Sequence, residues 1–280
     1  MKKRLQRILA QGRFLDEIMA WKRQQLPELM AETPEPHLQA LLAFTPPPVD
    51  WVTALARPGV SLIAEIKRAT PDKGLIAREF ELLPLAETCA AGGAAALLYA
   101  TDARFYQGHL QHLTAIKEHF RQQDVALPVL RHDFIFHPWQ LLQSRVAGAD
   151  GVILHMALLG DADYAHLLAY ARELGMEPLV QVHDEQELTR ALKARPRIIS
   201  LSNRNLRNFA LDTDVIPRLR PQIPADVLVV AGGGIRNAAD VAALQMAGVQ
   251  GVRIGESLMR QSAKQRLRKL RNLARAGQEI

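Results

Sequence analysis

Cysteine and long apolar runs are scarce in this chain of 280 residues. The single cysteine, Cys89, rules out an internal disulfide and fits a reducing cytoplasm. No apolar run approaches the roughly 18 residues that cross a membrane. The start, Met-Lys-Lys-Arg-Leu-Gln-Arg, lacks the apolar core of a secretory signal. We therefore expect a cytoplasmic protein with no membrane partner.

Positive charge is in modest excess, with a formal net charge of +6 that lies largely at the two ends. The stretch 262–276 repeats lysine and arginine at helical spacing. Nucleic-acid-binding segments combine such charge with aromatic side chains or a known motif, and neither is present here. We interpret this stretch as the solvated face of an outer helix and expect no nucleic-acid partner.

A repeating rhythm of short β-rich runs organises the middle of the chain. These runs lie at 61–67, 94–100, 127–131, 151–155, 178–182, 197–201, 227–231 and 251–254, with segments of helical period between them. None alternates cleanly between apolar and polar residues, which is typical of parallel strands buried on both faces. Eight such repeats predict a closed (β/α)8 barrel. An open doubly wound sheet is disfavoured because no glycine-rich dinucleotide turn follows an early strand.

The amino-terminal part precedes this rhythm. Apolar residues at helical spacing over 3–32 predict one or two amphipathic helices, and the proline-rich segment 44–48 predicts a stiff connector. We expect residues 1–50 to form a helical extension packed on the barrel, and residues 51–280 to form the barrel itself.

The first strand delivers two charges to the end of the barrel where active sites lie. Glu65 and Lys67 are two residues apart and therefore point to the same face of the strand. Buried charges of this kind either neutralise each other or meet a ligand. The following residues 70–74 contain proline and glycine and predict a mobile loop. A structural ion pair and a functional site are both compatible with these residues.

Two glycine turns follow the last two strands. Residues 231–237, Ala-Gly-Gly-Gly-Ile-Arg-Asn, and residues 254–257, Ile-Gly-Glu-Ser, each end a strand and open a helix. Glycine permits close approach of an anion to the backbone, and helix amino termini offer free N–H groups. Because these loops bind phosphate in many barrels, we predict a phosphate site at Gly234, Gly255 and Glu256.

Several stretches together resemble indole-3-glycerol phosphate synthase, an enzyme family of tryptophan biosynthesis. They are 18–23 (Ile-Met-Ala-Trp-Lys-Arg), 63–74 (Ile-Ala-Glu-Ile-Lys-Arg-Ala-Thr-Pro-Asp-Lys-Gly), 101–108, 130–135, 175–184, 203–206 and 254–260. The resemblance implies a phosphate-binding barrel with an amino-terminal extension. It also implies closure of a pyrrole ring on a carboxyphenylamino-deoxyribulose phosphate, with loss of carbon dioxide and water and without cofactor or metal. We expect a small phosphorylated substrate and a monomer or weak homodimer.

The resemblance also locates the family's catalytic positions, and several are altered. The first-strand glutamate and lysine fall on Glu65 and Lys67. The third-strand lysine falls on His132, the fifth-strand glutamate on Gln181, the sixth-strand asparagine on Ser202 and the seventh-strand Glu-Ser pair on Gly232-Gly233. Substrate contacts are implied for Thr70, Phe105, Gln181, Ser202, Arg204, Gly232 and Gly233. Glutamine and glycine carry no titratable proton, so we expect the ring-closing carbon–carbon lyase activity to be weak or lost.

Two alternatives remain at this point. The first is a working indole-3-glycerol phosphate synthase that uses Lys67, Glu65 and His132. The second is a metal-dependent enzyme with His132, His155 and His183 as ligands, because these residues end neighbouring strands. Separate hydrogen-bonded histidines are the expected arrangement, since the family uses no metal.

Overall fold

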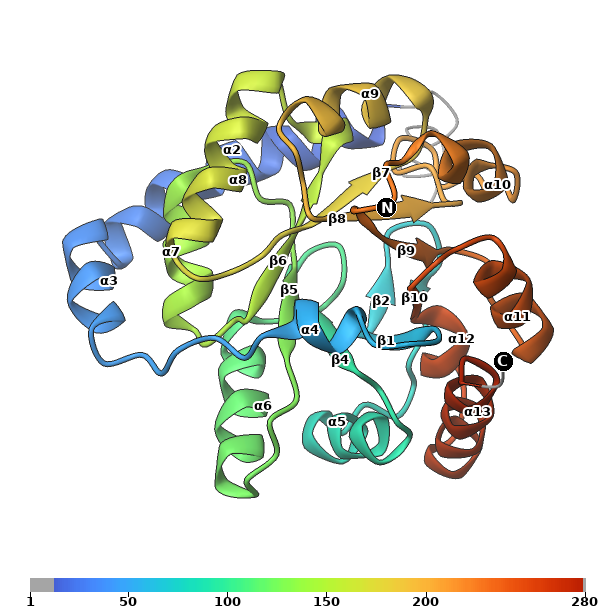
Figure 1. Cartoon of the computed structure of the whole chain (residues 1–280). Helices are drawn as coiled ribbons and strands as arrows, with labels where there is room; N and C mark the ends of the chain where they lie inside the picture. The colour runs from blue at the N-terminus through green and yellow to red at the C-terminus, as the bar shows by residue number, and fades with distance from the viewer. Residues whose placement is uncertain (1–12, 279–280) are drawn as a thin grey trace.

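The computed structural model describes residues 13–278, in which strands and helices alternate (Figure 1). The strands of the main sheet are β1 (Ser61–Ile66), β4 (Ala96–Ala100), β5 (Val129–His132), β6 (Gly151–His155), β7 (Leu179–Val182), β8 (Ile198–Ser202), β9 (Leu228–Gly232) and β10 (Gly251–Ile254). The helices around it are α5 (Leu82–Ala91), α6 (Leu110–Gln122), α7 (Pro138–Val146), α8 (Asp161–Glu173), α9 (Glu185–Lys193), α10 (Val215–Leu219), α11 (Ala238–Met246), α12 (Glu256–Met259) and α13 (Ala263–Ala276). Before the sheet come α2 (Phe14–Glu32), α3 (Glu35–Leu42) and α4 (Trp51–Leu55), and two short 3₁₀ turns, η1 (Met156–Leu158) and η2 (Arg220–Gln222), follow β6 and α10.

The main sheet closes on itself. Its strands are all parallel and follow the order β1-β10-β9-β8-β7-β6-β5-β4 around a closed barrel. Ile63 of β1 lies opposite Arg253 of β10 on one side and opposite Ala96 of β4 on the other. The predicted (β/α)8 barrel is therefore confirmed.

The two faces of the barrel strands explain the lack of polar alternation in the sequence. Inward-facing residues form one apolar cluster in the barrel axis, which includes Ile63, Leu130, Ile153 and Leu179. Outward-facing residues form a larger cluster with the surrounding helices. Because side chains two positions apart share a face, the residues two positions further along point into the carboxyl end of the barrel. They are Glu65, His132, His155 and Gln181.

The amino end of the barrel is closed by helix α4. Trp51 and Leu55 are buried within the axial cluster, and the Trp51 Nε1 donates to the backbone carbonyl of Glu177 at 3.0 Å. Asp50 caps the helix by accepting from the backbone N–H groups of Val52 and Thr53. The carboxyl end therefore remains as the accessible mouth.

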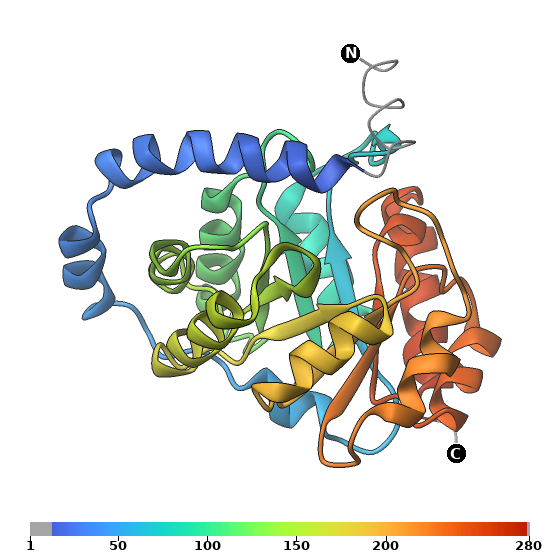
Figure 2. The same ribbon diagram turned by 90° about the horizontal axis from the view of Figure 1, so that it is seen from above.

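Helix α2, the long blue helix in Figure 2, runs along the loops at the carboxyl end of the barrel. Phe14 and Ile18 are fully buried in an aromatic cluster with Phe105, Phe134 and Phe209. These three residues follow β4, β5 and β8, so the helix covers loops at the carboxyl ends of the strands.

An ion cluster also ties α2 to the barrel. The Nζ of Lys22 lies 2.6 Å from Asp102 Oδ2 and 2.7 Å from Asp133 Oδ1. Burial favours the neutral amine, but the two carboxylates outweigh it and raise the pKa of Lys22. Lys22 and Arg131, in turn, outweigh the burial of Asp133 and lower the pKa of that carboxyl.

Three local features differ from the sequence expectations. Residues 70–74 belong to an antiparallel hairpin of β2 (Ala69–Thr70) and β3 (Gly74–Leu75) rather than to an irregular loop. Helices α3 and α10 were not predicted, because each is short and carries proline. Of the amphipathic segment 3–32, residues 14–32 form one helix, and residues 3–12 lie outside the described part.

Two further observations concern the single cysteine and the length of the apolar helices. Cys89 is fully buried in α5, and burial raises the pKa of its thiol to about 12, so it is a packing residue. Among residues 13–278, no helix combines the length and the apolar character that a membrane span requires.

Candidate functional site

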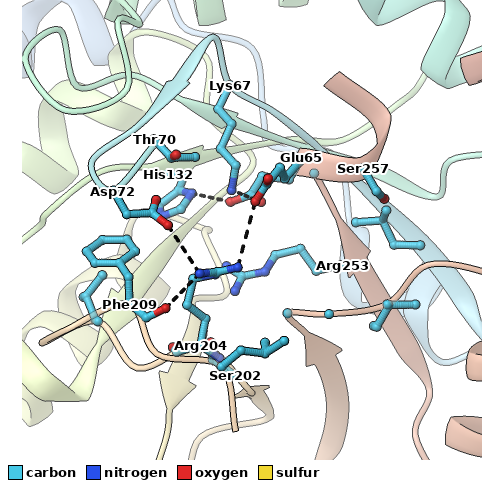
Figure 3. A pocket seen from close by; sticks show the side chains of 18 of the residues that line it. Glu65, Lys67, Thr70, Asp72, His132, Ser202, Arg204, Phe209, Arg253 and Ser257 are labelled. Atoms are coloured by element: carbon cyan, nitrogen blue, oxygen red, sulfur yellow. Dashed lines mark hydrogen bonds and ion pairs between the residues drawn. The ribbon is translucent and has the colours of Figure 1, made fainter. Parts of the chain in front are cut away.

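A cavity of about 350 Å³ opens at the carboxyl end of the barrel. Its lining brings together residues from almost every part of the chain, and Figure 3 labels ten of them. Those predicted from the sequence that line it are Glu65, Lys67, Thr70, His132, Gln181, Ser202, Arg204, Gly233, Gly234, Gly255 and Glu256. These residues, distant in the sequence, therefore lie around one cavity at the carboxyl end of the barrel.

Glu65, Lys67 and His132 form a compact ionic group on the β1 and β5 side of the mouth. Glu65 Oε2 accepts from Lys67 Nζ at 2.6 Å, and Glu65 Oε1 lies 2.9 Å from His132 Nδ1. The ring orientation of His132 leaves that nitrogen without a well-directed hydrogen bond. Lys67 and Glu65 thus neutralise each other before any ligand arrives.

Charge compensation and burial act in opposite directions on these groups. Burial pushes the pKa of Glu65 upward, but Lys67, Arg253 and His132 together hold it well below its ordinary value. Burial is also the main cause of the lowered pKa of His132, and contact with Glu65 offsets it only in part. The lowered pKa favours the neutral imidazole at pH 7, and a neutral imidazole is a poor proton donor.

The loops after β9 and β10 contribute glycine residues to the other end of the cavity. Gly233 and Gly234 have φ angles of +87° and +81°, a left-handed conformation that other residues rarely adopt. Ser257, just after Gly255, lines the same wall, and its buried hydroxyl has no partner within residues 13–278. These groups face the cavity where an oxyanion can accept hydrogen bonds.

A glycine is required at position 255 for a reason of packing as well. A Cβ placed on it would lie 2.3 Å from Glu65 Oε2 and 3.0 Å from Glu65 Cβ. Only glycine therefore allows β10 to pass beside the ionic group of β1. Gly255 was predicted for its backbone N–H group, and its packing against Glu65 is an additional constraint that involves residues far apart in the sequence.

Glu256 is surrounded by cations, so its negative charge does not dominate this wall. Its carboxylate accepts from Lys73 Nζ at 2.7 Å and from Arg260 Nε at 3.0 Å. Arg204 Nη2 lies 3.9 Å from Glu256 Oε2, and Arg204 Nη1 lies 3.5 Å from Asp72 Oδ2. Burial raises the pKa of Glu256, but Lys73 and Arg260 outweigh it and lower the pKa overall.

The side of the mouth formed by β7, β8 and β9 carries no titratable side chain at the altered positions. Ser202 and Gly232 are partners in the strand register, and Ser202 Oγ donates to the carbonyl of Arg204 at 2.9 Å. Gln181 Oε1 accepts from Arg253 Nη2 at 2.9 Å. The altered positions on this side therefore supply neutral groups, and the guanidinium of Arg253 lies beside them.

Arg253 is a buried site residue that was not predicted from the sequence. It lies in β10 opposite Gly232, lines the cavity and is only 9% exposed. A Cβ on Gly232 would lie 2.9 Å from its Nε, so this glycine leaves room for the guanidinium and does not itself line the cavity. The available signal was its position two residues before Gly255 on a strand of otherwise apolar residues.

Two predicted participants lie elsewhere. Phe105 is buried in the aromatic cluster under α2, with its ring centroid 5.5 Å from that of Phe14, and it does not line the cavity. His183 Nδ1 lies 2.7 Å from the Ser202 carbonyl oxygen, whereas His132 and His155 are neighbours with centroids 5.4 Å apart. Within residues 13–278, no three side chains of the metal-binding types converge. The three histidines are not arranged as a metal site.

Comparison with solved structures places the fold among (β/α)8 barrels. The chain is similar to a structure described as native KDPGal, with a TM-score of 0.59, 19% identity, and coverage of 79% of this chain and 95% of the other. It is also similar to a mutant tryptophan synthase α-subunit from Pyrococcus furiosus, with a TM-score of 0.59, 16% identity, and coverage of 77% and 98%. At these identities the likeness concerns the fold. The fold and the cavity thus define a (β/α)8 barrel with its site at the carboxyl ends of the strands.

Sequence comparison identifies the family within this class. The family model described as indole-3-glycerol phosphate synthase matches residues 15–270. Synthases of this name from Roseiflexus castenholzii and Acidithiobacillus ferrooxidans are each 40% identical, over 250 and 251 residues; both alignments cover 88% of this chain, and 93% and 94% of the relatives. The chain belongs to the indole-3-glycerol phosphate synthase family.

Proposed function

We propose that this protein binds a small phosphorylated ligand resembling carboxyphenylamino-deoxyribulose phosphate, and that it closes the pyrrole ring weakly or not at all. The observation that carries the proposal is the composition of one cavity. The glycine turns of β9 and β10 open into the same space as Glu65 and Lys67, while Gln181, Ser202 and Gly232 supply no acid or base. We place this function in the cytoplasm.

The proposed binding of a phosphate rests on the wall of the cavity formed by Gly233, Gly234 and Ser257, which we call the oxyanion wall. Gly233 and Gly234 expose backbone to the cavity, the Ser257 hydroxyl is unpartnered in the described structure, and the nearby cations Lys73, Arg204 and Arg260 outnumber Glu256 and Asp72. A phosphate bound here gains hydrogen bonds from backbone N–H groups and a favourable local potential.

The catalytic half rests on proton transfer. Loss of a positioned acid or base typically lowers a rate by about 10²–10⁴. His132, at the position that the resemblance assigns to a lysine, is held neutral by burial. A working synthase based on Lys67, Glu65 and His132 would need this imidazole to donate a proton, which its lowered pKa disfavours.

A direct test of the oxyanion wall is equilibrium binding of phosphate esters to the Gly234→Asp variant. The added carboxylate introduces bulk and negative charge, so we expect binding of ribulose 5-phosphate to fall below detection. Gly248→Asp is the matched control, because Gly248 has a similar φ of +75° but lies in the loop before β10, outside the cavity. Unchanged affinity in Gly234→Asp, or equal loss in both variants, would contradict the proposed site.

A further inference from the structure

Arg253 is a buried cation that forms no ion pair with an acidic side chain of residues 13–278. Its Nη2 donates to the neutral amide oxygen of Gln181, and its Nη1 is buried without a partner in the described structure. Buried charges are normally paired, because leaving water without a counter-charge is costly. The guanidinium therefore requires an anion that the chain itself does not provide.

The nearest candidate within the chain is already in contact with other groups. Glu65 influences Arg253 electrostatically, but its two oxygens approach Lys67 at 2.6 Å and His132 at 2.9 Å. The two cations of the site, Lys67 and Arg253, therefore differ in their partners. Lys67 has a counter-ion in Glu65, whereas Arg253 forms no ion pair among residues 13–278.

The surroundings of Arg253 add a second unpartnered group. His155 lies beside Gln181 in the strand register, lines the cavity and is 1% exposed. Neither of its ring nitrogens has a partner within the described residues. A neutral imidazole has one N–H to donate, and an oxyanion accepts such a bond readily.

We propose that Arg253, together with His155, binds a second oxyanion of the phosphorylated ligand, either a carboxylate or a second phosphate. The inference rests on the proposed phosphate site and narrows its ligand class. The ligand would place one phosphate at the oxyanion wall, beside Gly234, and another anionic group beside Arg253 and His155. Gly232 serves this subsite by leaving space for the guanidinium.

The test compares esters that differ in one anionic group. Ribulose 5-phosphate is paired with ribulose 1,5-bisphosphate, and ribose 5-phosphate with 5-phosphoribonate, so that a second phosphate and a carboxylate are probed separately. Titration calorimetry on the full chain should show at least one dianionic probe binding about 10- to 100-fold more tightly than its partner, the usual range for charge-assisted hydrogen bonds. Arg253→Met should remove this advantage, so that the two esters of a pair bind this variant with similar affinity.

A second variant retains the guanidinium and covers the case in which Arg253→Met does not fold. Gln181→Glu places a carboxylate in contact with Arg253, so the second oxyanion should lose its advantage there as well. If the probes of each pair bind wild type equally, or if the advantage persists in both variants, the subsite is contradicted while the phosphate site stands. If no ester binds wild type, the proposed function and this inference both fail.

Discussion

The two sides of the barrel mouth are built on different principles. On the β1 and β5 side, Glu65, Lys67 and His132 lie within 2.9 Å contacts and compensate one another. On the β7 to β10 side, Gln181, Ser202 and Gly232 are neutral, and Arg253 has no counter-ion among residues 13–278. The charges of the first side are compensated by side chains of the same side, whereas the charge of Arg253 on the second side has no such ion pair.

This difference shows why a family resemblance does not by itself fix an activity. Orientation of a substrate depends on shape and on fixed charges, and both sides retain these. Proton transfer depends on groups with suitable pKa values at particular positions. The altered positions on the second side lack such groups, so we expect substrate binding to exceed turnover in this chain.

The largest expected effect comes from rebuilding the second side. His132→Lys, Gln181→Glu, Ser202→Asn and Gly232→Glu restore the positions that the family resemblance implies. The structure adds Arg253→Leu, because a side chain at 232 would contact the guanidinium. The combined variant should raise ring closure by about 10²–10⁴, measured as indole-3-glycerol phosphate formation.

The single changes serve as controls for that variant. Each should produce much less than the set, because catalytic groups act as a unit. Gly232→Glu alone also requires Arg253 to move to admit the new side chain, and it places a carboxylate beside that guanidinium. A single change that recovers most of the combined gain would contradict the cooperative account.

The next effect concerns the ion cluster that holds α2 over the first side. Lys22→Met leaves Asp102 and Asp133 without their shared cation, so we expect a loss of roughly 3–5 kcal/mol in the free energy of unfolding. Arg23→Met is the matched control, because Arg23 is the exposed neighbour on the same helix. Chemical denaturation of both variants checks this, and equal losses would argue against a role for the buried cluster.

A smaller effect concerns Glu187 of α9, beside the second side. Its carboxylate accepts from the His183 backbone N–H at 2.9 Å, and burial raises its pKa to about 7. Between about pH 4.5 and 7 the unfolded chain has lost this proton and the folded chain retains it. Stability therefore falls as pH rises through this window, by about 3 kcal/mol in total.

Glu187→Gln should remove that slope, because an amide accepts the same hydrogen bond without ionising. Unfolding free energies at pH 5 and pH 8 measure it. Glu185→Gln is the control, since Glu185 is exposed on the same helix and its pKa is lowered by a backbone hydrogen bond and by Arg218. Parallel pH profiles for wild type and Glu187→Gln would contradict this assignment.

Much of this molecule follows from strand rhythm. Eight buried runs predicted the closed barrel, and parity within those runs placed Glu65 and Lys67 at the mouth. The hairpin at residues 69–75 was not predicted, because proline and glycine in a short segment indicate a turn without specifying the pairing around it. Short helices such as α3 have too few residues to show a period.

The site was predicted less completely, for a physical reason. Arg253 lies within an apolar strand, and its importance depends on what is absent around it, namely a side chain at 232 and a charge at 181. Phe105 was assigned to the substrate because of its motif, and tertiary packing placed it against Phe14 instead. Such effects depend on neighbours distant in sequence.

The most direct test of the central claim is steady-state turnover of carboxyphenylamino-deoxyribulose phosphate by the unmodified protein, with binding of the same compound measured in parallel. We expect saturable binding that Gly234→Asp abolishes, and turnover far below the range of about 1–10³ per second of ordinary enzymes. Turnover within that range would contradict the account. His132 would then be supplying the proton that its buried, neutral state is expected to withhold.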